Sequence, residues 1–139
     1  MRHMATAAFS FDRFLSASLL SRVREVEEGL PVSALRAVAD GKVVTLSDLV
    51  GVVAARRTLD RRLANDGRLT LEESDRLARF AEILNLTTQV IGDRARAMEW
   101  LRSPKQRLDG ERPLDLMRTY SGGEAVVNLL NQARYGMLA

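Results

Sequence analysis

The chain has 139 residues, of which 46% are hydrophobic and 28% are charged, and these are the proportions of a soluble globular protein. It contains no cysteine, which excludes disulfides and thiolate chemistry and is compatible with the cytoplasm, where we expect the protein to reside. The net charge of +3 is small, and no apolar stretch reaches the roughly 18 residues that a membrane span needs.

The first residues, Met1-Arg2-His3-Met4, are expected to be an artificial extension, with Met4 as the natural start. No signal peptide is expected, because a charged region followed by a continuous apolar stretch is missing. His3 is the only histidine, so the folded part offers no histidine for acid–base catalysis or for a metal site. We therefore expect no cofactor, no metal and no enzymatic activity.

The cations are almost all arginine, since only Lys42 and Lys105 are lysines. Arginine pairs bidentately with phosphates and carboxylates, which fits an anionic partner. The composition of a GC-rich genome explains the enrichment equally well.

Apolar residues recur every three or four positions from Phe9 to Glu28, and this spacing predicts one amphipathic helix. Gly29 is expected to end that helix, and Pro31 suits the first turn of a short helix over 30–39. We assign residues 1–29 to an N-terminal helix that is a candidate for dimerisation.

Further helix starts are predicted where a hydroxyl residue precedes an acidic residue by three positions. This pattern occurs at Thr45–Asp48, Thr70–Glu73 and Ser121–Glu124. Strand-like alternation is almost absent, so we predict an all-α fold. The turn over 65–68 divides it into a helix-turn-helix portion, 30–67, and a helical C-terminal half, 68–139.

Residues 45–63 have the pattern of a helix-turn-helix. Gly51 suits the tight turn between two helices, Val53 is expected to anchor that turn, and Leu59 and Leu63 are expected to be buried. The other faces of the second helix carry residues that can bind phosphates and base edges. These candidate DNA-binding residues are Arg56, Arg57, Thr58, Arg61 and Arg62.

Two other considerations bear on this helix. A solvated arginine-rich helix in a bundle would have the same residues, and Asp60 opposes DNA binding unless it pairs with Arg57 or Arg61. A single copy is also a small footprint, because helix-turn-helix proteins usually pair two copies on half-sites. We therefore predict a homodimer or a higher complex.

A cluster near the C-terminus has an order that helix formation alone does not require. A helix over 94–102 ends near Trp100, the only tryptophan, and Pro104 prevents its continuation. Pro113 suits the start of a further short helix. We interpret the cluster as architectural and expect its apolar members to be buried, namely Trp100, Leu101, Leu108 and Leu116.

The cluster resembles the toxin-binding module of the Xre/MbcA/ParS-type antitoxins. The resemblance rests on Ala97, Trp100-Leu101, Pro104, Leu108, Gly110, Pro113-Leu114-Asp115-Leu116, Thr119, Val127, Leu130 and Gly136. Residues 57–62, together with Leu71, Leu77 and Arg79, look like the Xre-like portion of the same family. The match covers about 32–136, and the doubled Gly122-Gly123 departs from the pattern and leaves the register of the last helix open by one residue.

This resemblance implies an antitoxin that inhibits a cognate RES-domain toxin, a protein that consumes NAD or transfers ADP-ribose from it. It implies that the antitoxin covers the NAD pocket of the toxin and represses its own operon by binding operator DNA. An alternative is a free-standing helix-turn-helix regulator whose C-terminal half only dimerises.

The residues after the last helix are the candidate toxin-binding tail: Arg134, Tyr135, Gly136, Met137, Leu138 and Ala139. Gly136 can end the helix with a positive φ, and an aromatic ring, an arginine and a terminal carboxylate suit a pocket for a charged dinucleotide. An ordinary frayed terminus has the same composition, and taken alone the tail favours that interpretation.

Overall fold

The computed structural model describes residues 9–136. The regular elements of this part are helices, accompanied by two isolated bridges, Pro31 with Arg68 and Val50 with Ala54. The prediction of an all-α fold is therefore confirmed. No helix in the described part is long and apolar enough to cross a membrane.

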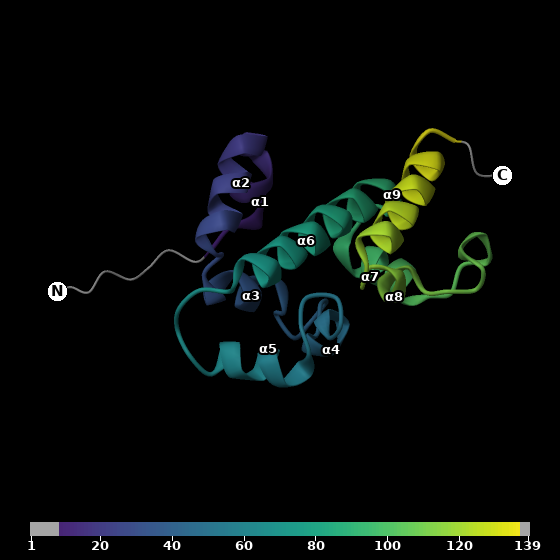
Figure 1. The fold of residues 1–139 in the computed structure, drawn as a ribbon. Helices are drawn as coiled ribbons and strands as arrows, with labels where there is room; N and C mark the ends of the chain where they lie inside the picture. Colours follow the sequence, from purple (N-terminus) through teal and green to yellow (C-terminus); the bar gives the residue numbers. More distant parts are fainter. Residues whose placement is uncertain (1–8, 137–139) are drawn as a thin grey trace.

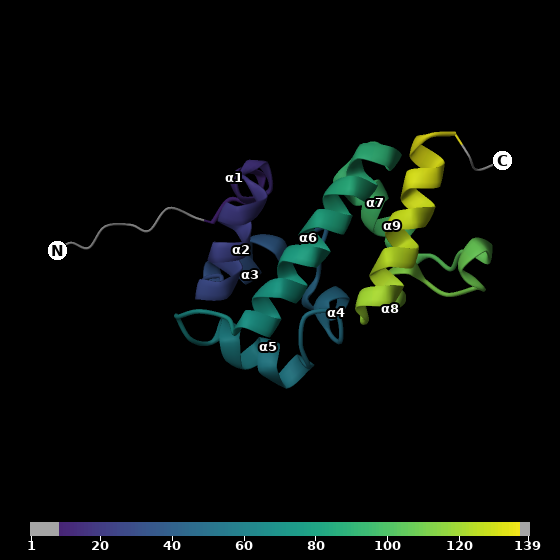
Figure 2. The ribbon, with the colours of Figure 1, turned by 45° about the horizontal axis from the view of Figure 1, so that its top comes forward.

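The helices surround one long central helix (Figure 1). In chain order they are α1 (Phe11–Ser16), α2 (Leu19–Glu28), α3 (Val32–Val38), α4 (Leu46–Leu49), α5 (Arg56–Leu63), α6 (Leu71–Ile91), α7 (Arg94–Arg102), the 3-10 turn η1 (Gln106–Leu108), α8 (Pro113–Leu116) and α9 (Tyr120–Arg134). Helices α1 and α2 lie at one end of α6, and α7 to α9 lie at the other (Figures 1 and 2).

Helix α6 is 21 residues long and packs against α2, α7 and α9. It begins at the predicted capping box, in which the Thr70 N–H donates to Glu73 Oε1 at 2.9 Å and the Glu73 N–H donates to Thr70 Oγ1 at 3.1 Å. Its inner face carries Leu77, Phe80 and Ile83, each at most 1% exposed. This face joins the two halves of the chain in one hydrophobic core.

The prediction of a single helix over 9–28 is wrong, because the chain breaks at Ala17 and Ser18. Ser10 caps α1 and Ser18 caps α2, where Ser18 Oγ accepts the Ser21 N–H at 3.1 Å. Serine favours such local caps over helix interiors, and the backbone therefore turns at Ser18. The apolar spacing continues across this turn and did not reveal it. The predicted end at Gly29 is confirmed by its φ of 91°.

The predicted start of the last helix is also wrong by two residues. Thr119, and not Ser121, is the N-cap, and its Oγ1 accepts the Gly122 N–H at 3.0 Å. Glu124 is then too far along the helix to reach back to the cap, and it forms an ion pair with Arg79 of α6 instead. The acidic residue at this position therefore joins two helices and does not cap one.

The tryptophan is not the centre of the core. Leu101 is fully buried with Ala97 and Met98 on the inner face of α7, whereas Trp100 lies on the flank of that helix and is half-buried. Its ring is covered by the Lys105 ammonium, whose Nζ lies 4.7 Å from the ring centroid. Leu108 and Leu116 are likewise half-buried. Of the four residues that were predicted to be buried, only Leu101 is therefore fully buried.

Candidate functional site

The helix-turn-helix geometry is formed by α4, a tight turn and α5. Gly51 has a φ of 80°, and its N–H donates to the Ala54 carbonyl at 3.0 Å. Val53 is 1% exposed and holds the turn in the core, as predicted. Leu59 at 1% exposure anchors α5. The turn and the buried face of α5 therefore direct the opposite face of α5 to the outside.

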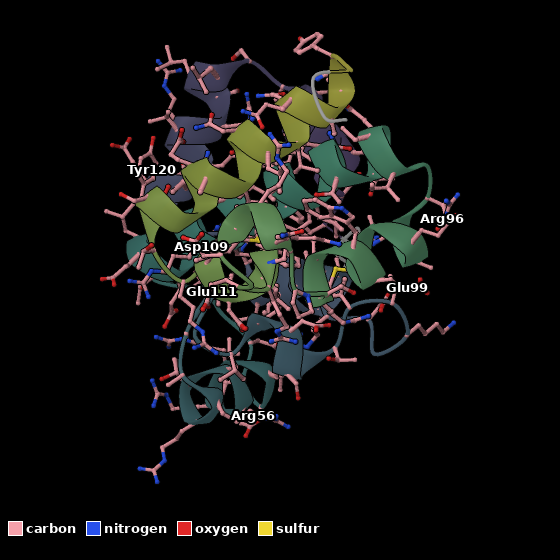
Figure 3. The ribbon with its side chains drawn as sticks, turned by 90° about the vertical axis from the view of Figure 1, so that its right-hand side faces the viewer. Arg56, Arg96, Glu99, Asp109, Glu111 and Tyr120 are labelled. Atoms are coloured by element: carbon pink, nitrogen blue, oxygen red, sulfur yellow. The ribbon has the colours of Figure 1, made fainter. Side chains whose placement is uncertain are left out.

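Three of the predicted DNA-binding residues, Arg56, Arg57 and Arg61, are exposed, and Thr58 is half-buried beside them. Helix α5 lies along an outer edge of the molecule, below α6 in Figure 1, and Arg56 projects at that edge in Figure 3. Asp60 pairs with Arg56 at 3.6 Å, and not with the arginines expected from the sequence. This exposed pair is weak and leaves the face predominantly basic.

Arg62 has a different position. Its Nε and Nη2 donate to the two carboxylate oxygens of Glu73 at 3.0 and 3.2 Å, which ties α5 to the start of α6. Burial raises the pKa of Glu73, but hydrogen bonds from Thr70 and Arg62 outweigh it and the pKa is lowered. Because this guanidinium is engaged inside the protein, the open basic face consists of Arg56, Arg57, Thr58 and Arg61.

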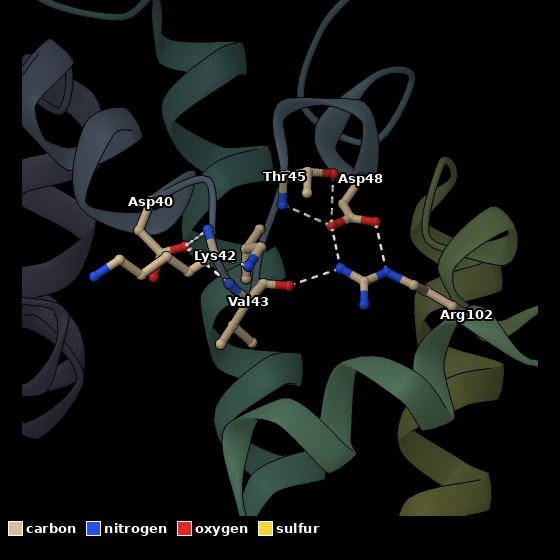
Figure 4. A network of polar contacts seen from close by, with 7 residues as sticks. Asp40, Lys42, Val43, Thr45, Asp48 and Arg102 are labelled. Atoms are coloured by element: carbon tan, nitrogen blue, oxygen red, sulfur yellow. Dashed lines mark hydrogen bonds and ion pairs between the residues drawn. The ribbon is translucent and has the colours of Figure 1, made fainter.

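A part-buried ion pair connects the helix-turn-helix to the C-terminal half (Figure 4). Arg102, the last residue of α7, donates to Asp48 Oδ1 at 3.0 Å and to Asp48 Oδ2 at 2.6 Å. It also donates to the Val43 carbonyl at 2.7 Å. The Asp48 side chain is 8% exposed and that of Arg102 is 34% exposed. The pair therefore fixes α4 against α7 through a largely desolvated carboxylate.

Asp48 also completes the predicted cap of α4, since the Thr45 N–H donates to its Oδ2 at 2.8 Å. Burial raises the pKa of this carboxyl, but the hydrogen bonds from Arg102 and Thr45 prevail, so the pKa lies below its ordinary value. Sequence reasoning identified Asp48 as a residue of the helix start and missed Arg102. The two residues are 54 positions apart, and no local pattern links them.

The C-terminal half presents a closed loop between α7 and α8. The Lys105 N–H donates to the Glu111 carbonyl at 3.1 Å and the Gly110 N–H donates to the Lys105 carbonyl at 2.9 Å. Asp109 at the tip is left-handed, with a φ of 57°. Asp109 and Glu111 are exposed and project from this loop (Figure 3). The loop is thus an ordered projection that carries charges of both signs, since Lys105 and Arg107 lie in it as well.

The candidate tail leaves the far end of α9, away from α5 (Figure 1). The guanidinium of Arg134 lies 6.0 Å from the centroid of the Tyr135 ring, and Tyr135 is 71% exposed. Gly136 has a φ of 69°, as predicted for a helix end. Met137, Leu138 and Ala139 lie outside the described residues, so the structure brings together only the first part of the predicted tail.

Two family models match this chain. Residues 21–82 match the antitoxin Xre-like helix-turn-helix domain, and residues 86–136 match the antitoxin Xre/MbcA/ParS C-terminal toxin-binding domain. The first match contains α4 and α5, and the second contains α7 to α9. Neither domain is that of an enzyme.

Three relatives show how far the likeness extends. A protein named antitoxin Xre from Pseudomonas putida is 39% identical over 80 residues, which are 58% of this chain and 50% of that protein. Another antitoxin Xre, from Photorhabdus laumondii, is 27% identical over 82% of this chain and 78% of its own length. A Prs ADP-ribosylating antitoxin from Sphingobium is 25% identical over 96% of this chain and 91% of its own length.

Proposed function

We propose, from the premise that this chain belongs to the Xre-type antitoxin family, that it neutralises a cognate RES-domain toxin and represses its own operon. The observation that carries this proposal is the pair of matched domains, each with a surface of fitting chemistry. The basic face of α5 suits DNA phosphates, and the tail of α9 offers an arginine and an exposed aromatic ring. A protein with these two partners is expected to act in the cytoplasm.

Toxin binding is assigned to the C-terminal half. We propose that the tail from Arg134 to Ala139 enters the NAD pocket of the toxin and excludes the dinucleotide. Tyr135 is 71% exposed, so its ring is available for stacking in such a pocket without unfolding α9. One relative is named for an antitoxin function connected with ADP-ribosylation, which supports a toxin that uses NAD as its substrate.

Deletion of residues 135–139 is expected to abolish neutralisation and to leave the fold intact, because among the described residues it removes only the hydrogen bonds from the Tyr135 and Gly136 N–H groups that close the end of α9. The measurement is NAD consumption by the product of the adjacent reading frame, purified and mixed with wild-type or truncated antitoxin. Circular dichroism of the truncated chain checks the fold. Substitution Arg107→Ala, in the loop of the same half, is the control. Full inhibition by the truncated chain would show that the pocket is covered by another segment.

Operator binding is assigned to the basic face of α5. Substitutions Arg57→Ala and Arg61→Ala are each expected to weaken binding to the operon's own promoter. Each is also expected to reduce the slope of log affinity against log salt by about one, because one phosphate fewer is neutralised. Arg96→Ala, an exposed arginine on α7, is the matched control and should change neither quantity. Wild-type affinity that is independent of salt would contradict phosphate binding by this face.

One experiment separates this function from that of a free-standing regulator. Co-expression with the product of the adjacent reading frame, followed by pull-down and NAD measurement, is expected to give a stable complex and protected NAD. A regulator whose C-terminal half only dimerises would give neither result. A dimer or a higher complex is part of the proposal, because one copy of α5 covers only a half-site.

A further inference from the structure

An arginine of the C-terminal half lies against the helix-turn-helix. Arg118 belongs to the short connection between α8 and α9, within the residues that match the toxin-binding domain. A Cβ placed on Gly51 would lie 2.9 Å from Arg118 Nε and 3.5 Å from Arg118 Cζ. Helix α8 also lies beside α4 in both Figures 1 and 2. Because Gly51 forms the turn between α4 and α5, the guanidinium of Arg118 rests directly on that turn.

The contact leaves the outer side of this guanidinium open. Glycine at position 51 provides the space that the contact needs, since any Cβ there would strike the arginine. The Arg118 side chain is nevertheless 57% exposed. Its N–H donors are therefore held beside the turn and stay accessible to a ligand from outside the protein.

The charge of Arg118 is poorly matched by the protein itself. Among residues 9–136, Arg118 forms an ion pair with Asp115 alone, at 3.7 Å between Nη2 and Oδ1. The two oxygens of Asp115 already accept hydrogen bonds from Arg112, each at 2.8 Å. The pKa of Asp115 is lowered chiefly by these bonds from Arg112. Arg112 therefore holds the carboxylate, and Arg118 remains a nearly free cation.

The surface around the turn has an excess of positive charge. Arg56, the first residue of α5, donates to Ser47 Oγ of α4 at 3.4 Å, so a second guanidinium lies against the segment 47–51. Asp60 offsets only Arg56, with which it pairs. The loop between α7 and α8 adds two cations and two anions, which balance one another: Lys105, Arg107, Asp109 and Glu111. Arg118 thus continues the basic face of α5 across the turn.

The docking geometry of a helix-turn-helix places phosphates beside this turn. The second helix lies in the major groove with its N-terminal residues at the base edges, while the first helix crosses the sugar-phosphate backbone. In this chain the turn at Gly51 connects α4 to the N-terminal end of α5. A backbone that passes α4 therefore also passes the turn. Arginine suits this position because its guanidinium pairs bidentately with phosphate oxygens.

We infer that Arg118 binds a phosphate of the operator, so that the DNA interface extends from the helix-turn-helix onto the C-terminal half. The inference rests on the proposed function in one respect, namely that α5 contacts the operator. A phosphate contact carries no sequence information, so Arg118 adds affinity and fixes the register of the protein on the duplex. The base preference is left to α5.

This role is compatible with toxin binding by the same half. Arg118 precedes the start of α9, and the candidate tail leaves the other end of this 15-residue helix. A helix of this length spans about 22 Å, so the two surfaces are well separated. Operator and toxin can therefore engage the C-terminal half at the same time.

Substitution Arg118→Gln tests the inference on the full-length chain, alone and in complex with toxin. Binding is measured by fluorescence anisotropy with two duplexes of equal length, the operon's own promoter and an unrelated sequence. The variant is expected to bind both duplexes about fivefold to tenfold more weakly and to reduce the slope of log affinity against log salt by about one for each bound copy. Arg118→Lys keeps a cation that binds phosphate and should stay within about threefold of wild type.

Two controls separate a phosphate contact from a general effect. Arg96→Gln makes the same change in net charge on α7, far from Arg56 in Figure 3, and should alter neither affinity nor salt slope. The Arg118→Gln chain should neutralise toxin as the wild type does, and circular dichroism should show an unchanged fold.

Neutral methylphosphonate substitutions in the promoter duplex locate the contact. For the wild type, neutralising one phosphate beside the bases contacted by the N-terminal end of α5 is expected to weaken binding. The Arg118→Gln variant should be insensitive to the same substitution, because the cation that meets this phosphate is already absent.

Two outcomes would overturn the inference while operator binding by α5 stands. One is an Arg118→Gln chain with wild-type affinity and salt slope under conditions in which Arg57→Ala weakens binding. The other is loss of toxin neutralisation with DNA binding retained, which would make Arg118 a toxin contact. Absence of DNA binding by the wild-type chain, alone and with toxin, would refute operator binding itself and the inference with it.

Discussion

Substitution Gly122→Ala is expected to destabilise the protein by about 3 kcal/mol or more, while Gly123→Ala is expected to be neutral or slightly stabilising. A Cβ at Gly122 would lie 1.8 Å from the Leu116 carbonyl oxygen, which belongs to the backbone at the end of α8. That oxygen cannot move unless α8 shifts relative to α9. A Cβ at Gly123 would lie 3.5 Å from Ile83 Cδ1, which is an ordinary contact.

The two glycines make a matched pair, because both lie in the first turns of α9 and differ only in what faces them. Alanine is the better helix former, so Gly123→Ala should gain up to about 1 kcal/mol of stability if its contacts are undisturbed. Urea denaturation followed by circular dichroism measures both free energies of unfolding. Equal effects at the two positions would contradict the close approach of α8 to Gly122. The same contrast identifies Gly122, and not Gly123, as the glycine of this pair that the fold requires.

Substitution Arg102→Ala is expected to cost about 3 kcal/mol of unfolding free energy, because it leaves the buried Asp48 carboxylate without its main partner. The variant also removes the donor to the Val43 carbonyl and the direct link between α4 and α7. Arg112→Ala is the control, since Arg112 also pairs bidentately with an aspartate, Asp115, at 2.8 Å. The Asp115 side chain is 30% exposed, so that loss should stay below about 1 kcal/mol.

The pH dependence of the same variant gives an independent readout. In the wild type the pKa of Asp48 is lowered on folding, so its contribution to stability is present above about pH 4, the ordinary range of aspartate, and is lost as the pH falls through the lower folded value. In Arg102→Ala burial dominates and the pKa of Asp48 should rise. The stability difference between wild type and variant is therefore expected to be largest at neutral pH. It should narrow as the pH falls, first through the raised pKa of Asp48 in the variant and then through the lowered pKa in the wild type. A constant difference would contradict the role of this ion pair.

The parts of the fold that were predictable from the sequence are those encoded in short segments. The capping box at Thr70 and Glu73 and the positive φ of Gly29 and Gly51 depend on neighbours within four residues, and each was located correctly. The break at Ser18 was missed because apolar spacing continues through it. Periodicity reports which face is apolar and does not report where a serine turns the backbone.

The candidate site was predictable only in part, for a similar reason. The arginines of α5 were apparent from composition, but the engagement of Arg62 by Glu73 depends on how α5 lies against α6. The pairing of Asp48 with Arg102 joins residues 54 positions apart. Trp100 was expected to be buried as a member of the C-terminal cluster, whereas α7 directs Leu101 into the core. The assignment of a toxin partner came from resemblance to a family, and no single residue carries it.

Helix α6 has a consequence for how such antitoxins diversify. The helix-turn-helix match ends at residue 82 and the toxin-binding match begins at residue 86, so both boundaries fall inside the single helix Leu71–Ile91. The two halves therefore cannot be exchanged between relatives at this boundary without rebuilding a packed helix. Operator preference and toxin preference are expected to be inherited together, and chimeric antitoxins should fold only when α6 and the helices that pack on it come from one parent.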